Sequence, residues 1–133
     1  MKIQYAMTIC LCLTFATLFT AGCKDTTVRG TSGISLTIQP PQTAVVIKRG
    51  EMQSLEVALV RSGFSDAVKV DLIQLPAGVT AQKASLNVET DKATYILTAN
   101  PAADLVANHQ AKLIATGPGG MKATQYVTIT VTE

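Results

Sequence analysis

The sequence contains no tryptophan, and aromatic residues make up only 5% of its 133 residues. Proteins that hold single-stranded nucleic acid need aromatic rings on which bases stack, and this chain supplies few. Charge is also sparse, because 11 Lys and Arg stand against 9 Asp and Glu and no block of one sign occurs. Nucleic-acid-binding domains usually gather basic residues on one face. We therefore expect no nucleic-acid partner.

Side chains for catalysis or metal binding are equally scarce. His109 is the only histidine, and a general base needs a nucleophile and an orienting carboxylate; Asp104 is near in sequence, but no serine is. Zinc sites draw three or four ligands, mostly Cys and His. Calcium needs several converging oxygens, for which Glu89-Thr90-Asp91 is the nearest candidate, although solvated loop charges explain it better. We predict no enzyme activity, no catalytic residue, no cofactor and no metal.

The first 23 residues have the order of an export signal. Lys2 is followed by an uncharged, mostly apolar run over residues 3–19 and then by Thr20-Ala21-Gly22-Cys23. A charged start, an apolar stretch and small residues at the end are typical of such signals. A bilayer span needs about 20 predominantly apolar residues, and this run with Gln4 and several threonines is marginal. An ordinary secretory signal cut elsewhere and an uncleaved anchor are the alternatives.

Ala21-Gly22-Cys23 resembles the lipobox of bacterial lipoproteins, with Thr20 where that family usually has leucine. The resemblance implies a helical signal peptide over residues 1–22, cut before Cys23, and acylation of Cys23. It also implies a lipid-anchored protein of the cell envelope. Lys24 in place of aspartate resembles the class sorted to the outer membrane, which we favour over the inner membrane. Cys10 and Cys12 would leave with the signal.

Removing residues 1–22 leaves 111 residues, enough for one domain. Such a chain can bury about two thirds of its unfolded surface. Residues 24–33 are small, polar and punctuated by glycine. We expect residues 23–33 to form a lipidated flexible tether reaching on the order of 15–20 Å. The folded domain is expected over residues 34–133.

Apolar and polar residues alternate with a period of two over most of that domain. This period is typical of strands with one buried face. The runs that qualify are residues 34–38, 44–47, 55–60, 68–72, 79–82, 85–88, 93–99, 110–116 and 122–132. One helical turn is expected at residues 102–106, and a hairpin turn at Gly117-Pro118-Gly119-Gly120. Seven to nine short strands with turns between them predict an all-β, antiparallel sandwich.

The same order resembles bacterial immunoglobulin-like domains. The resemblance covers residues 34–132 and rests on the Lys-Arg-Gly-Glu turn at 48–51, the Leu-x-Val-x-Leu-Val-Arg strand after it, Leu-Pro-Ala-Gly-Val at 75–79 and the terminal Val-Thr-Ile-Thr-Val. Antibody-type domains add a buried tryptophan, an inter-sheet disulfide and a tyrosine corner, which this chain lacks. The resemblance implies a sandwich of immunoglobulin-like topology.

Possible partner-contact residues lie on the last strand and on one loop. Val127, Ile129 and Val131 are expected to face inward, and the alternate residues outward. The outward candidates for partner contact are Tyr126, Thr128 and Thr130, to which Phe64 adds a loop tip. Threonine is also an ordinary residue of solvated strands, and Phe64 can simply pack beneath its loop.

These features favour a non-enzymatic binding, adhesion or structural module at the envelope. Exposed sheet edges can accept a strand from another protein, so an envelope protein is the expected partner. The alternative is a carbohydrate-binding accessory domain that binds a polysaccharide through Tyr126. A small enzyme or enzyme inhibitor is the third possibility, and loss of activity on His109→Ala would identify catalysis.

Overall fold

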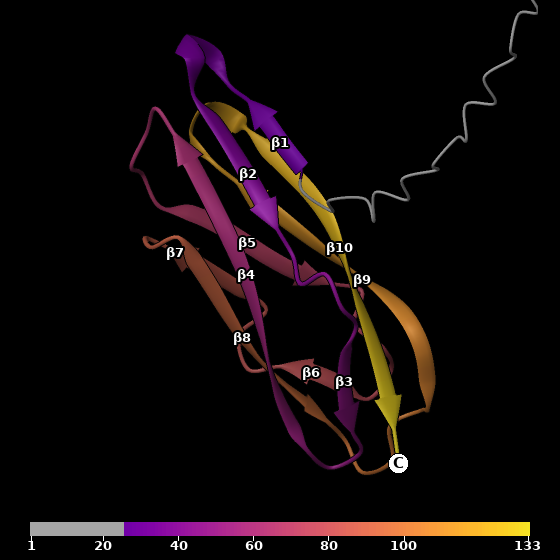
Figure 1. Cartoon of the computed structure of the whole chain (residues 1–133). Helices are drawn as coiled ribbons and strands as arrows, with labels where there is room; N and C mark the ends of the chain where they lie inside the picture. The colour runs from indigo at the N-terminus through magenta and orange to yellow at the C-terminus, as the bar shows by residue number, and fades with distance from the viewer. Residues whose placement is uncertain (1–25) are drawn as a thin grey trace, which may run out of the picture.

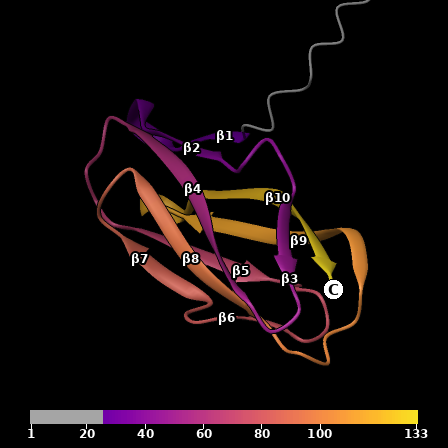
Figure 2. The ribbon, with the colours of Figure 1, turned by 60° about the horizontal axis from the view of Figure 1, so that its bottom comes forward.

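The structure, a computed structural model, describes residues 26–133. The predicted signal peptide and Cys23 lie outside these described residues. Ten strands form two five-stranded sheets that pack face to face (Figures 1 and 2). In residues 26–133 no helix is long and apolar enough to cross a bilayer. The all-β sandwich predicted from the sequence is confirmed.

The first sheet has the order β1-β2-β4-β8-β6, and the second has the order β3-β10-β9-β5-β7. The strands of the first sheet are β1 (Thr26–Arg29), β2 (Ser35–Gln39), β4 (Met52–Ser62), β8 (Lys92–Ala99) and β6 (Val79–Ala81). Those of the second are β3 (Val45–Lys48), β10 (Lys122–Thr132), β9 (Val106–Thr116), β5 (Val68–Ile73) and β7 (Ser85–Val88). Two short 3₁₀ turns, η1 (Thr31–Gly33) and η2 (Pro118–Gly120), complete the described elements.

The strand order has immunoglobulin-like topology. If β2, β4, β5, β6, β8, β9 and β10 are labelled A to G, the sheets contain A-B-E-D and G-F-C, the arrangement of immunoglobulin domains. β1, β3 and β7 are added at sheet edges. β3 runs parallel to β10, whereas every other pair is antiparallel. The predicted antiparallel sandwich is therefore confirmed in class, with ten described strands in place of the seven to nine predicted and with one parallel pair, β3 and β10.

The strand that the sequence did not predict, β1, lies in the segment expected to be a flexible tether. Thr26–Arg29 pair antiparallel with β2, in register from Thr26↔Ile38 to Arg29↔Ser35. Val28 packs against the core, and the hydroxyls of Thr27 and Thr37 lie 2.6 Å apart. The prediction that the domain begins at residue 34 is therefore wrong. The physical reason is that β2 offers an edge that a short β-branched run can join.

The core fills the space between the inner faces of the two sheets. Among the described residues, this core consists of apolar side chains and Tyr95 and contains no charged residue. The alternation predicted for the last strand is confirmed, because Val127, Ile129 and Val131 are at most 3% exposed. Tyr95 of β8 is the largest fully buried side chain.

Connections at one end of the sandwich are tightly hydrogen-bonded. The predicted helical turn at 102–106 is wrong. Instead, the Asn100 side chain accepts a 2.8 Å hydrogen bond from the Ala102 N–H, and β9 begins at Val106.

Gly78 has φ +81°, and a Cβ built there would lie 2.6 Å from the Ala103 Cα. Only glycine fits this approach of two loops.

The chain changes sheets between β2 and β3. Pro40-Pro41 follow β2, and because proline lacks the N–H that a ladder needs, strand pairing ends there. The chain then enters the second sheet as β3, beside the last residues of β10. A groove lies at this crossing between the two sheets.

Candidate functional site

The outward threonines predicted as contact residues are already engaged within the second sheet. Thr128 Oγ1 accepts a 2.9 Å hydrogen bond from Gln110 Nε2, and Thr130 Oγ1 accepts one of 3.2 Å from the Asn108 N–H. Asn108 has φ +56° and lies where the β9–β10 register shifts. The Thr130 hydroxyl therefore helps to stabilise a β-bulge, whereas the Thr128 hydroxyl bonds its regular cross-strand partner. Tyr126, on the same face, is 45% exposed.

Phe64 is partly buried and packs against the core. The structure therefore favours packing beneath its loop over presentation to a partner.

His109 lies near the end of β5. Its Nε2–H donates a 2.7 Å hydrogen bond to the carbonyl oxygen of Gln74, a residue with φ +59°. A carbonyl can only accept, so the contact places a proton on Nε2. The ring therefore joins the bulged end of β9 to the chain after β5.

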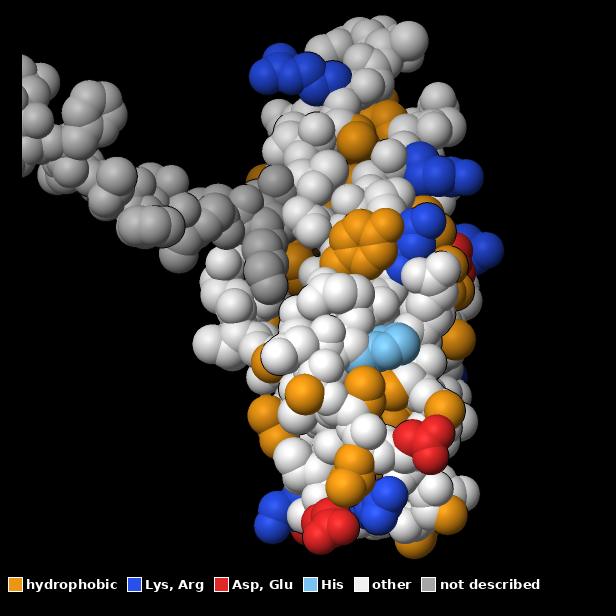
Figure 3. All heavy atoms as spheres, turned by 90° about the vertical axis from the view of Figure 1, so that its right-hand side faces the viewer, with side chains coloured by type: hydrophobic (Ala, Val, Ile, Leu, Met, Phe, Trp, Pro, Cys, Tyr) orange, Lys and Arg blue, Asp and Glu red, His pale blue; other side chains and the backbone are white. Residues whose placement is uncertain are grey.

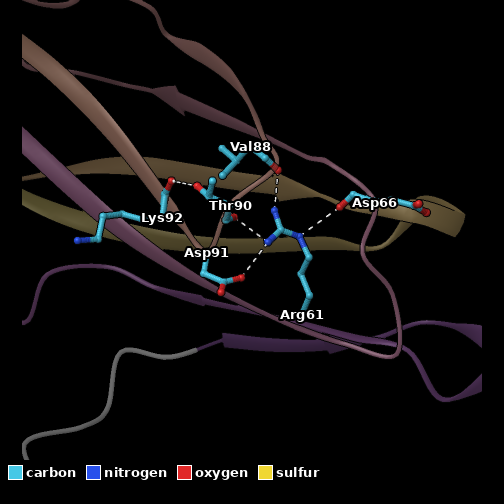
Figure 4. A network of polar contacts seen from close by, with 6 residues as sticks. All are labelled: Arg61, Asp66, Val88, Thr90, Asp91 and Lys92. Atoms are coloured by element: carbon cyan, nitrogen blue, oxygen red, sulfur yellow. Dashed lines mark hydrogen bonds and ion pairs between the residues drawn. The ribbon is translucent and has the colours of Figure 1, made fainter.

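Arg61, at the end of β4, is the centre of the polar network drawn in Figure 4. Its Nη1 donates to the Thr90 carbonyl oxygen at 2.7 Å and to Asp91 Oδ1 at 3.1 Å. Its Nη2 donates to the Val88 carbonyl oxygen at 2.6 Å, and its Nε donates to the Asp66 carbonyl oxygen at 3.2 Å. The Arg61 side chain is only 7% exposed. It ties two loops to the end of β4.

This network also explains the role of Glu89-Thr90-Asp91, the run that was the nearest candidate for a calcium site. Thr90 and Asp91 direct oxygens at a guanidinium, which already supplies the positive charge. In the part of the chain that the structure describes, no three His, Cys, Asp or Glu side chains group as metal ligands.

A groove of about 510 Å³ lies at the crossing between the sheets. One wall comes from the end of β2 and from β3, and the other from the first half of β4. We call it the β3–β4 groove. Its lining residues are Gln39, Pro40, Pro41, Thr43, Ala44, Val45, Val46, Gln53, Ser54, Leu55, Glu56, Ala58 and Lys92.

An open sheet edge forms the β4 wall of this groove. β4 has eleven residues but β2 has only five, and β2 pairs with residues 58–62 alone. Among residues 26–133, the first half of β4 therefore has β8 on one side and no strand on the other. Such an edge presents backbone donors and acceptors for a further strand.

The alternation of hydrogen bonds along β4 identifies which backbone groups face the groove. The Leu59 N–H donates to the Asp91 carbonyl oxygen, and the Glu51 carbonyl oxygen accepts from the Ala99 N–H. Odd-numbered residues thus bond toward β8. Because groups alternate in an antiparallel ladder, the backbone groups of Ser54 and Glu56 point into the groove.

The rim of the groove carries an ion pair. Lys92 Nζ lies 3.3 Å from Glu56 Oε2, and both side chains are more than half exposed. Across the groove, Val46 of β3 is 53% exposed. The site therefore combines open backbone groups, apolar surface and one exposed charge pair.

Sequence reasoning did not identify this groove. The signal was available in the Pro40-Pro41 break, which ends β2 opposite the middle of a long alternating run.

Comparison with known proteins adds no further assignment, because no family model matches the chain and no curated protein matches it.

Proposed function

We propose that the chain is a lipid-anchored, non-enzymatic binding module of the bacterial cell envelope. The support for the anchor is Thr20-Ala21-Gly22-Cys23 after an apolar run, which resembles a lipoprotein signal. Acylation at Cys23 would hold the domain on a membrane, and Lys24 favours the outer membrane over the inner one.

The open edge of β4 is the observation that carries the binding role. An extended segment of an envelope protein would pair with the backbone groups of Ser54 and Glu56, as in other cases of strand addition. Alternate side chains of that segment would lie against Pro40, Pro41 and Val46, which line the groove.

The ends of the two sheets are less suitable for strand addition. β1, β3, β6 and β7 contain only three or four residues each, and short edge strands are one way in which proteins prevent further pairing. The six residues of β4 that β2 leaves uncovered form a longer template.

Site-specific photo-crosslinking tests this proposal in cells that express the full chain. A benzophenone amino acid replaces Gln53 in the groove or, as a control, Thr94, which is exposed on β8. We expect one envelope protein to crosslink at position 53 through an extended segment, and not at position 94. Ser54→Pro, which removes a groove-facing N–H, should abolish that product. Equal labelling at both positions would contradict the proposal.

Carbohydrate binding is the second candidate, and the exposure of Tyr126 on a flat strand face favours it. The test is retention of the mature domain on immobilised envelope polysaccharide. Retention that is lost in Tyr126→Ala but unchanged in Ser54→Pro would favour this function over strand binding.

A further inference from the structure

The distance between the proposed anchor and the folded domain is short. This inference rests on the proposed acylation of Cys23. Only Lys24 and Asp25 separate Cys23 from Thr26, the first residue of β1. Three residue steps reach at most about 10 Å. The lipid must therefore enter the membrane close to Thr26, and the domain cannot stand clear of the headgroups.

Thr26 lies on a long side of the sandwich, not at one of its ends. It pairs with Ile38, and its Oγ1 accepts a 2.8 Å hydrogen bond from Gln125 Nε2 in the middle of β10. Figure 1 shows β1 lying beside β10 along the length of the molecule. A membrane held within reach of Thr26 therefore meets the side where β1 and β10 come together.

Five of the strands on this side carry positive charge and contain no acidic residue. β1, β2, β3, β9 and β10 contain Arg29, Lys48, Lys112 and Lys122 but no Asp or Glu. In Figure 3, which views this side, blue side chains lie at the top and beside the large orange side chain in the upper half of the face, and red ones lie toward the lower end and the right-hand margin. Such a surface is complementary to anionic lipid headgroups.

The outer face of β10 and β9 also presents an aromatic side chain. Tyr126 is 45% exposed and points to the outer face of β10, whereas the neighbouring Gln125 points to the opposite face, where it bonds Thr26. The cross-strand partner of Tyr126 on β9 is Lys112. Tyrosine has an apolar ring and a polar hydroxyl, which suit the interface between headgroups and water. Asp71, the acidic residue that β5 adds to this face, lies 3.7 Å from Lys69 Nζ.

We propose that the outer surface of β10 and β9 around Tyr126, Lys112 and Lys122 rests on anionic lipid headgroups when Cys23 is acylated. The short connection limits the domain to this side, and the lysines and Tyr126 select the face. The outer face of the first sheet, where Thr94 lies, then points away from the membrane.

A single introduced tryptophan can report this orientation, because the chain has none. Acylated full-length product is purified from a bacterial host, its lipid is verified by intact mass, and it is placed in phosphatidylglycerol–phosphatidylcholine vesicles with nitroxide-labelled headgroups. We expect strong quenching for Tyr126→Trp and no quenching for Thr94→Trp. Equal quenching at the two positions, or stronger quenching at position 94, would overturn the orientation.

Two further variants separate the causes. Ten Gly and Ser residues inserted between Asp25 and Thr26 should abolish the difference between the two reporters, because the domain is then free to turn. Lys112→Gln with Lys122→Gln should reduce quenching at position 126 in anionic but not in purely zwitterionic vesicles. A protein without lipid by mass would refute the anchor itself, an outcome distinct from a lipidated protein with the wrong orientation.

Discussion

The hydroxyl of Tyr95 on β8 donates a 2.7 Å hydrogen bond to the carbonyl oxygen of Val70 on β5. The two strands belong to different sheets, so one side chain joins the layers through the core. Tyr95 is 1% exposed. Burial raises the pKa of its hydroxyl well above the ordinary value, and the negative charge of Asp71 raises it further. The protonated hydroxyl is therefore part of the folded state.

Tyr95→Phe should destabilise the domain although the ring is kept. The change removes the hydrogen bond and leaves the Val70 carbonyl without this donor, which costs about 1–3 kcal/mol in a buried site. Urea unfolding followed by circular dichroism measures the loss. Tyr126→Phe, at an exposed position, is the control and should change stability by less than about 0.5 kcal/mol. Equal effects of the two variants would contradict a structural role for the Tyr95 hydroxyl.

The same tyrosine predicts a loss of stability at high pH. An unfolded tyrosine ionises near pH 10, whereas the raised pKa keeps Tyr95 protonated in the folded state. Above about pH 10 the unfolded state therefore holds fewer protons, and the free energy of unfolding falls as pH rises. The contribution is fully present below that pH. Tyr95→Phe should show a shallower decline between about pH 10 and 12, measured by urea titrations at each pH.

Arg61 predicts a specific requirement for a guanidinium. It makes four hydrogen bonds to the loops around Asp66 and Asp91 from a side chain that is 7% exposed. Arg61→Lys keeps the charge but lacks the planar set of donors, so we expect a loss of about 2 kcal/mol, and a larger one for Arg61→Ala. Lys92→Ala, which removes an exposed ion pair, should cost less than about 1 kcal/mol. Thermal unfolding of the three variants makes the comparison.

The sequence predicts the sheets well where alternation is strong and local. Residues 85–88 and 122–132 were expected as strands and form β7 and β10 with those bounds. Here apolar residues alternate with polar ones, so the period and the burial agree.

The elements that were missed depend on distant partners. β1 holds one strongly apolar residue, Val28, and becomes a strand because β2 provides an edge. The Arg61 network uses backbone carbonyls up to 29 residues away, which leave no mark in side-chain pattern. The β3–β4 groove arises from a mismatch in strand length after Pro40-Pro41. Each of these is a tertiary effect that overrides local preference.

Alanine cannot be accommodated at position 78 without strain. Its φ is +81°, and an added Cβ would lie 2.6–2.7 Å from the Ala103 Cα and Cβ. Gly78→Ala combines the penalty of left-handed backbone with a clash against the neighbouring loop, so we expect a loss above about 2 kcal/mol. Gly119→Ala has a similar φ of +68° but open space, and it should cost only about 1–2 kcal/mol. The difference between their urea midpoints isolates the loop contact.

Two neighbouring proline substitutions test which side of β4 is open. Gln53 and Ser54 are both exposed and lie in the same strand. The Gln53 N–H points toward β8, where Gln53 pairs with Leu97, whereas the Ser54 N–H points into the groove. Gln53→Pro therefore removes a ladder hydrogen bond and should lower stability by about 2–3 kcal/mol. Ser54→Pro should change it by less than about 1 kcal/mol, because proline is accepted where a strand edge is unpaired.

Chemical denaturation of the two variants gives the energies, and amide hydrogen exchange gives the location. In Gln53→Pro the amides of residues 51–57 and of their partners on β8 should lose protection, while in Ser54→Pro they should keep it. Equal destabilisation would mean that the groove side of β4 is bonded as fully as the β8 side. If Ser54→Pro is stable, as expected, it is the folded control that the strand-binding proposal requires. Any loss of binding in this variant could be assigned to the missing N–H of residue 54.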